Sequence, residues 1–221
     1  WVSDIKADNE GNTWIVLPNQ GVFRLAPDGS IRHYIFGSAD EPDNGSAESI
    51  CIDKSDKIWI GTNGNGIYRY DSNTDSFEQY LGDSDGNTLK GDNIYCMADI
   101  DNDIVIGSHT GKLRRFNKRR NSVTDFDTPQ IHNKIIRDVK VFDDKIWVGT
   151  QVGVFIIDSN SGAVDHIAYD PMNSATLSDN QIGKIFRDRE KGIWIGTNLG
   201  GINYVSPFHT NFLRYVPLTG N

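Results

Sequence analysis

The sequence predicts an all-β fold assembled from repeated four-stranded antiparallel units. Three observations support this prediction. Tryptophan recurs in short apolar segments at a nearly constant spacing, the hydrophobic pattern changes four times within each repeat, and no stretch has the periodicity of an amphipathic helix. The chain has 221 residues, 37% of them hydrophobic, so it is long enough to bury a sizeable core.

The repeat is marked by the segments "TWIV", "IWIG", "IVIG", "IWVG" and "IWIG". The marker positions, which are 42 to 47 residues apart, are Trp14, Trp59, Val105, Trp147 and Trp194. An aspartate stands six residues before the marker in every copy except the fourth, which has Val141 there. Gly-Thr or Gly-Ser follows the marker in every copy except the first. Agreement at several positions indicates five copies of one structural unit.

The second copy shows what one unit contains. The segment "SICID" is a short apolar strand, "IWIGT" is apolar on both faces, "IYRYD" alternates, and "FEQY" is mostly polar, with polar turns between them. Four short strands in about 45 residues are typical of a β-propeller blade. We therefore predict one propeller domain over 1–221, with blade units near 1–36, 47–81, 92–127, 133–168 and 177–216. The five marker residues are expected to pack between blades as structural core.

The glycine-rich stretch "GTNGNG", 61–66, has two interpretations. A phosphate-binding loop opens a helix, whereas these glycines precede the strand-like "IYRYD". The corresponding stretch of the fifth copy, "GTNLGG", also precedes a strand-like segment. We therefore predict a turn of "NGNG" between two strands, with positive φ at Gly66 and Gly201.

The fifth copy, "NQIGKIFRDREKGIWIGTNLGGINYVSP" over 180–207, resembles the two-component regulator propeller repeat. The linkers "NTLKGDN" and "ATLSDNQ" resemble the segments that precede such repeats. The resemblance implies the periplasmic sensor region of a Bacteroidetes hybrid two-component histidine kinase. Its implied ligand is an oligosaccharide from polysaccharide breakdown, and its implied assembly is a homodimer. Kinase activity and any membrane helix are expected in other segments, because we interpret this chain as a piece of a longer protein.

The number of blades departs from the resemblance, because family propellers usually have seven. The five copies are interpreted either as part of a seven-bladed propeller or as a closed ring of five. The first interpretation is favoured because each unit begins with its inner strand and ends with its outer strand, which leaves no strand to close a ring.

Composition and motifs argue against several other functions. The net charge of −8 disfavours nucleic acid or an anionic membrane surface, and the one basic run, 112–120, is better explained as a solvated strand and turn. Two cysteines provide neither a disulfide framework nor a zinc motif, and no G-x-S-x-G is present. We expect no catalytic residue, metal or cofactor in this chain. The alternatives are a protein-interaction scaffold and, with less support, a polysaccharide lyase or hydrolase.

Ligand-binding residues are expected on one face of the propeller. That face carries the links between blades and the turns between second and third strands, and binding residues concentrate on loops held by a rigid scaffold. Planar polar groups and an aromatic ring suit sugar hydroxyls. The candidates are Asn63, Asn65, Tyr95, His109, Arg137, Gln151, Lys184 and Asn198. The alternative for each of them is an ordinary turn or strand-end residue.

Overall fold

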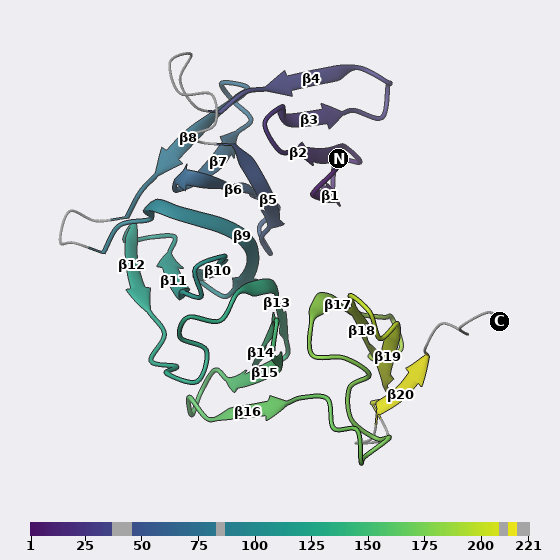
Figure 1. The fold of residues 1–221 in the computed structure, drawn as a ribbon. Helices are drawn as coiled ribbons and strands as arrows, with labels where there is room; N and C mark the ends of the chain where they lie inside the picture. The colour runs from purple at the N-terminus through teal and green to yellow at the C-terminus, as the bar shows by residue number, and fades with distance from the viewer. Residues whose placement is uncertain (37–45, 83–86, 208–211, 216–221) are drawn as a thin grey trace. The chain divides into compact units, whose positions relative to one another are not determined.

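The computed structural model describes residues 1–36, 46–82, 87–207 and 212–215. Their secondary structure consists of twenty β-strands, and no helix among them is long and apolar enough to cross a membrane (Figure 1). Consecutive strands pair antiparallel in groups of four, and we call these groups blades 1 to 5. The prediction of an all-β fold of four-stranded antiparallel units is confirmed.

The chain divides into two compact units, 1–127 and 128–221. The first unit holds blade 1, with β1 (Asp4–Ala7), β2 (Thr13–Leu17), β3 (Gly21–Leu25) and β4 (Ile31–Tyr34). Blade 2 has β5 (Ala47–Ile52), β6 (Ile58–Asn65), β7 (Ile67–Asp71) and β8 (Ser76–Tyr80). Blade 3 has β9 (Lys90–Ile100), β10 (Asp103–Ser108), β11 (Leu113–Asn117) and β12 (Ser122–Asp125).

The second unit holds the remaining two blades. Blade 4 has β13 (Ile136–Phe142), β14 (Lys145–Thr150), β15 (Gly153–Asp158) and β16 (Val164–Ile167). Blade 5 has β17 (Ile182–Arg187), β18 (Ile193–Thr197), β19 (Ile202–Val205) and β20 (Phe212–Tyr215). Each strand lies inside its predicted blade unit, except that β9 begins at Lys90, ahead of 92. Residues 208–211 and 216 of the fifth predicted unit lie outside the described residues, and the single domain over 1–221 stays a prediction.

The core of each unit lies between adjacent blades. Trp14 and Val16 of β2 pack with Ile58 and Ile60 of β6, and Trp59 of β6 packs with residues of β9, β10 and β11. In the second unit, Trp147 belongs to a cluster with residues of β17 and β18. Trp14 and Trp59 are each only 1% exposed. Strand β6 is apolar on both faces because blade 1 covers Ile58 and Ile60 and blade 3 covers Trp59.

A glycine after the marker segment allows the next blade to come close. A Cβ at Gly61 of β6 would lie 2.5 Å from Ile94 Cγ2 of β9, and one at Gly149 of β14 would lie 2.6 Å from Ile182 Cγ2 of β17. Real Cβ atoms do not make contacts this short, so the first strand of the next blade requires glycine there. This packing explains why the repeat keeps a glycine at this position.

The stretch "GTNGNG" differs in part from its prediction. Strand β6 continues to Asn65, and Asn63 and Asn65 pair with Asn93 and Lys90 of β9. The prediction that 63–66 form only a turn is therefore wrong, because the start of β9 runs beside this stretch and supplies it with ladder partners. Gly66 does have a positive φ of 72°, and its carbonyl accepts a 2.7 Å hydrogen bond from the Thr62 hydroxyl, which closes the hairpin.

Candidate functional site

Each blade has two ends with different connections. We call the end with the second-to-third-strand turn and the links between blades the link end. We call the end with the first-to-second and third-to-fourth turns the hairpin end. All eight predicted ligand-binding residues lie at the link ends: those in unit 1–127 are Asn63, Asn65, Tyr95 and His109, and those in unit 128–221 are Arg137, Gln151, Lys184 and Asn198.

The first strand of blades 2 to 5 carries an extra residue near the link end. In β5, Ala47 pairs with Thr62 and Ser49 pairs with Gly61, which leaves Glu48 without an opposite residue. The same irregularity occurs at the corresponding position of β9, β13 and β17. The bulged residues are Glu48, Tyr95, Arg137 and Gly183. Because a bulge redirects a side chain and is frequent beside binding sites, these positions are suited to face a ligand.

Sequence reasoning identified two of these positions and missed Glu48. The aromatic ring of Tyr95 and the planar guanidinium of Arg137 predict sugar binding at these two positions. Lys184 is the residue directly after the bulge at Gly183. A signal for the bulge does exist in the sequence. Each bulged residue directly follows a small or apolar residue of the first strand, and that residue is fully buried in every case: Ala47, Ile94, Ile136 and Ile182. Burial raises the pKa of Glu48, so this carboxyl lies in a partly desolvated place.

The link end of unit 1–127 brings three predicted residues together around Asn93. The backbone N–H of His109 donates to the Asn93 carbonyl at 3.2 Å, and the rings of Tyr95 and His109 are 5.8 Å apart. Asn63 pairs directly with Asn93. The side-chain oxygen of Asn93 is buried and has no hydrogen-bond partner in the described protein. Asn65, the fourth predicted residue of this unit, pairs with Lys90 of β9 instead of with Asn93.

The link end of unit 128–221 also contains polar atoms without partners. Arg137 Nε and Gln151 Oε1 are buried and unpaired in the described residues. Asn198 is engaged, because its Nδ2 donates to Gln181 Oε1 at 3.2 Å. Lys184 Nζ lies 4.0 Å from the buried carboxylate of Asp138. Arg137, Gln151 and the Lys184 ammonium are therefore the groups of this end with hydrogen-bonding capacity to offer a ligand.

The hairpin ends are held by an aspartate clasp that sequence reasoning recorded but did not interpret. Asp8, Asp53 and Asp188 each accept a hydrogen bond from the indole N–H of the tryptophan six residues later, at 2.8, 3.1 and 2.7 Å. The same carboxylates accept backbone N–H groups of the turn. Burial raises the pKa of Asp8 and Asp53, but these hydrogen bonds outweigh it and hold both below the ordinary value. The clasp explains why an aspartate stands six residues before the tryptophan in these copies of the repeat.

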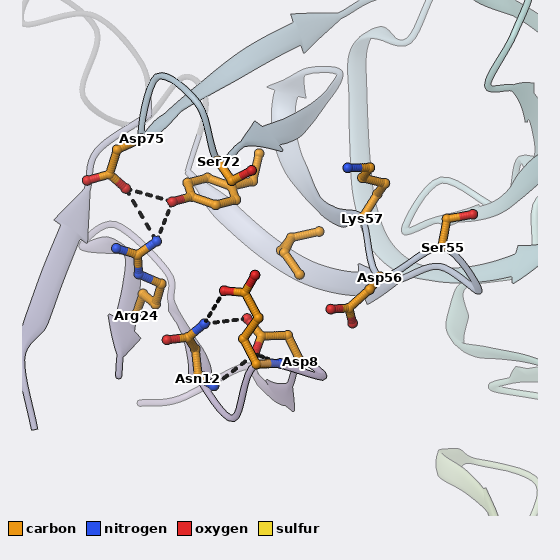
Figure 2. Close-up of a pocket in the computed structure, with 11 residues that line it drawn as sticks. Asp8, Asn12, Arg24, Ser55, Asp56, Lys57, Ser72 and Asp75 are labelled. Carbon is orange, nitrogen blue, oxygen red and sulfur yellow. Dashed lines mark hydrogen bonds and ion pairs between the residues drawn. The ribbon is translucent and has the colours of Figure 1, made fainter. Parts of the chain in front are cut away.

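A pocket of about 630 Å³ opens between blades 1 and 2 at the hairpin end (Figure 2). Its lining includes the turn residues Asp8, Glu10 and Asn12 of blade 1 and Ser55, Asp56 and Lys57 of blade 2. No sequence prediction pointed to this pocket, because turn chemistry alone accounts for residues of these types. Within the described chain, no three His, Cys, Asp or Glu side chains are grouped to hold a metal ion.

One wall of the pocket is an ionic and aromatic network. Tyr34 and Tyr70 donate hydrogen bonds to Asp75 Oδ1 at 2.6 and 2.7 Å, and Arg24 Nη1 lies 3.4 Å from the same oxygen and donates to the Tyr70 hydroxyl. The hydrogen bonds from Tyr34 and Tyr70 lower the pKa of Asp75. The Arg24 guanidinium lies 5.6 Å from the centre of the Trp14 ring. The network joins blade 1 to blade 2 and fixes this wall.

Comparison with protein families decides the nature of the repeat. The two component regulator propeller model matches residues 40–64 and 176–199. The chain carries two-component regulator propeller repeats. The two matches include the glycine-rich stretch of blade 2 and the corresponding strand of blade 5, so the resemblance predicted from the sequence is confirmed.

A curated relative and two solved structures are similar to this repeat chain. Histidine kinase P4 of Formosa agariphila is 25% identical over 160 residues, which are 69% of this chain and 12% of the kinase. The extracellular domain of a putative hybrid two component system from B. thetaiotaomicron superposes with a TM-score of 0.58 at 19% identity, covering 92% of this chain and 38% of that one.

Virginiamycin B lyase from Staphylococcus aureus superposes with a TM-score of 0.74 at 14% identity, covering 99% of this chain and 70% of the lyase. At identities this low, the likeness shows a common fold alone.

Proposed function

We propose that this chain is the oligosaccharide-sensing part of a hybrid two-component histidine kinase, located in the periplasm. The propeller repeats support this function, as do the kinase relative and the likeness to an extracellular domain. The chain spans 12% of the kinase, and we propose that phosphorylation belongs to other segments of such a protein. The assembly we propose is the homodimer that the resemblance implies.

The observation that carries the proposal is the recurring bulge at the link end. It redirects an aromatic side chain, Tyr95, and a planar cationic one, Arg137. In unit 1–127 the Asn93 side-chain oxygen has no partner among the described residues, and in unit 128–221 the same is true of Arg137 Nε and Gln151 Oε1. Buried polar atoms are nearly always paired, so an unpaired one beside a bulge suits a hydroxyl of a bound sugar. We propose Tyr95 as the main contact of the first unit and Arg137 as that of the second.

We also propose that the blades belong to a larger propeller, as the resemblance to seven-bladed proteins implies. Blade 5 supports this. A Cβ at Gly196, which corresponds to Gly61, would have no neighbour closer than 3.8 Å among the described residues. On the same face of blade 5, Phe186 is 62% exposed and Tyr215 is 54% exposed. These features are those of a blade that receives another blade.

Isothermal titration calorimetry against a panel of glycan oligosaccharides tests the sensing function. The parent is expected to bind at least one of them, and Tyr95→Ala and Arg137→Ala are expected to bind at least about tenfold more weakly. Arg189→Ala is the matched control, because Arg189 is exposed and lies in a hairpin-end turn. No heat from any oligosaccharide would contradict the proposal. Released reducing ends or unsaturated products would instead favour an enzyme.

A further inference from the structure

We propose that the pocket between blades 1 and 2 is a second carbohydrate site, which takes a neutral, hydroxyl-rich sugar unit and rejects acidic sugars. That the ligand is a sugar rests on the proposed function, and the charge of the pocket lining narrows the ligand to neutral sugars. Its volume of about 630 Å³ falls within the range of about 300–1,000 Å³ that is usual for small-molecule sites. The pocket lies at the opposite end of the strands from Tyr95.

The lining of the pocket contains both hydrogen-bond donors and acceptors. Lys57 Nζ and the Ser72 hydroxyl make no hydrogen bond or ion pair in the described chain, and the Glu10 carboxylate accepts only a long 3.5 Å hydrogen bond from Asn12 Nδ2. Figure 2 shows Asp56 and Lys57 across from Arg24 and Asp75. Adjacent hydroxyls of a sugar ring act both as donors and as acceptors, so they suit a lining that mixes carboxylates with amine and hydroxyl groups.

The charge of the lining selects against anions. Asp75 is offset by Arg24, whereas Asp8, Glu10 and Asp56 are balanced only by Lys57. The carboxylates of Asp8 and Asp56 also accept backbone N–H groups, which hold them in place. The net charge of the whole chain, −8, acts in the same direction. A uronic acid placed here would meet more negative than positive charge, and such like-charge placement is unfavourable.

The indole N–H signal of Trp14 reports directly on binding at this site. Its N–H donates to Asp8, which lines the pocket, so a sugar bound there changes the environment of that proton. Trp194 makes the same bond to Asp188 in blade 5 and provides an internal reference. We would titrate nitrogen-15-labelled protein with disaccharides of glucose, galactose and mannose, and with their uronic acid counterparts. The expected result is a saturable shift of the Trp14 indole signal with a neutral disaccharide, none with its acidic counterpart, and an unmoved Trp194 signal.

Two variants and their matched controls test the assignment. Lys57→Met is expected to weaken the response of the Trp14 signal by about tenfold, and Glu10→Gln is expected to admit the uronic form. Lys145→Met and Glu190→Gln make the same changes at the corresponding turn positions of blades 4 and 5, and they should leave the response unchanged.

The outcomes separate this proposal from the sensing function. If calorimetry detects oligosaccharide binding while the Trp14 signal stays fixed, or if Lys57→Met and Glu10→Gln respond as the parent does, the second site is wrong and the sensing function stands. If no sugar binds by either method, both proposals are wrong.

Discussion

The two ends of the blades in unit 1–127 are built in different ways. At the hairpin end, the carboxylates of Asp8 and Asp53 are saturated with hydrogen bonds from turn amides and from a buried indole. At the link end, the strands carry a bulge, and the Asn93 oxygen is left without a partner. The repeated aspartates of the hairpin end hold the fold, whereas the link end leaves the Asn93 oxygen available beside the bulge. This difference teaches that the repeated aspartates and the proposed ligand-facing residues of the link end are separate sets.

The largest expected effect concerns the marker tryptophans. Trp59→Ala should lower the free energy of unfolding by about 3–5 kcal/mol, because the side chain is fully buried and its removal leaves a cavity. Trp194→Ala should cost less, because Trp194 is partly exposed. Urea denaturation of both variants measures the difference. Equal losses would show that burial between blades is not what distinguishes the two tryptophans.

The glycine that follows the marker allows blades 2 and 5 to be compared with one kind of substitution, glycine to alanine. Gly61→Ala should cost about 1–3 kcal/mol, because its methyl group would overlap Ile94 and Ser49. Gly196→Ala should change stability by no more than about 0.5 kcal/mol, because its nearest neighbour is a carbonyl 3.8 Å away. Thermal melting of the two variants checks this. A stable Gly61→Ala protein would refute the close approach of β9.

The aspartate clasp predicts a pH dependence. The native pKa values of Asp8 and Asp53 are lowered, so their stabilisation is complete above the unfolded pKa of about 3.9 and is lost as the pH falls through the lower native values. Asp53→Ala should cost about 1–3 kcal/mol at neutral pH, because the buried indole N–H loses its acceptor. It should also flatten the acid side of the stability profile. Asp165→Ala, at an exposed position, is the control, and an unchanged profile for Asp53→Ala would argue against the clasp.

Much of the fold can be predicted from the sequence. The recurrence of Trp59 and its counterparts and the two-residue alternation of "IYRYD" identify the strands, because the marker segment occurs five times at a nearly constant spacing. The division of roles at the two ends is harder to predict. Asp53 resembles an ordinary turn residue until its bond to Trp59 is seen, and Glu48 resembles a strand residue until its missing partner is seen. The pocket depends on how three separate turns come together in space, which no local sequence pattern indicates.

The most direct test of the difference between the two ends is the Tyr95→Ala variant, measured both for stability and for oligosaccharide affinity. Tyr95 lies at a bulge and is partly exposed, so its loss should change the free energy of unfolding by no more than about 1 kcal/mol. Its affinity for the oligosaccharide that the parent binds should fall by at least about tenfold. A variant that loses stability as Asp53→Ala does, yet binds the sugar as the parent does, would contradict the account.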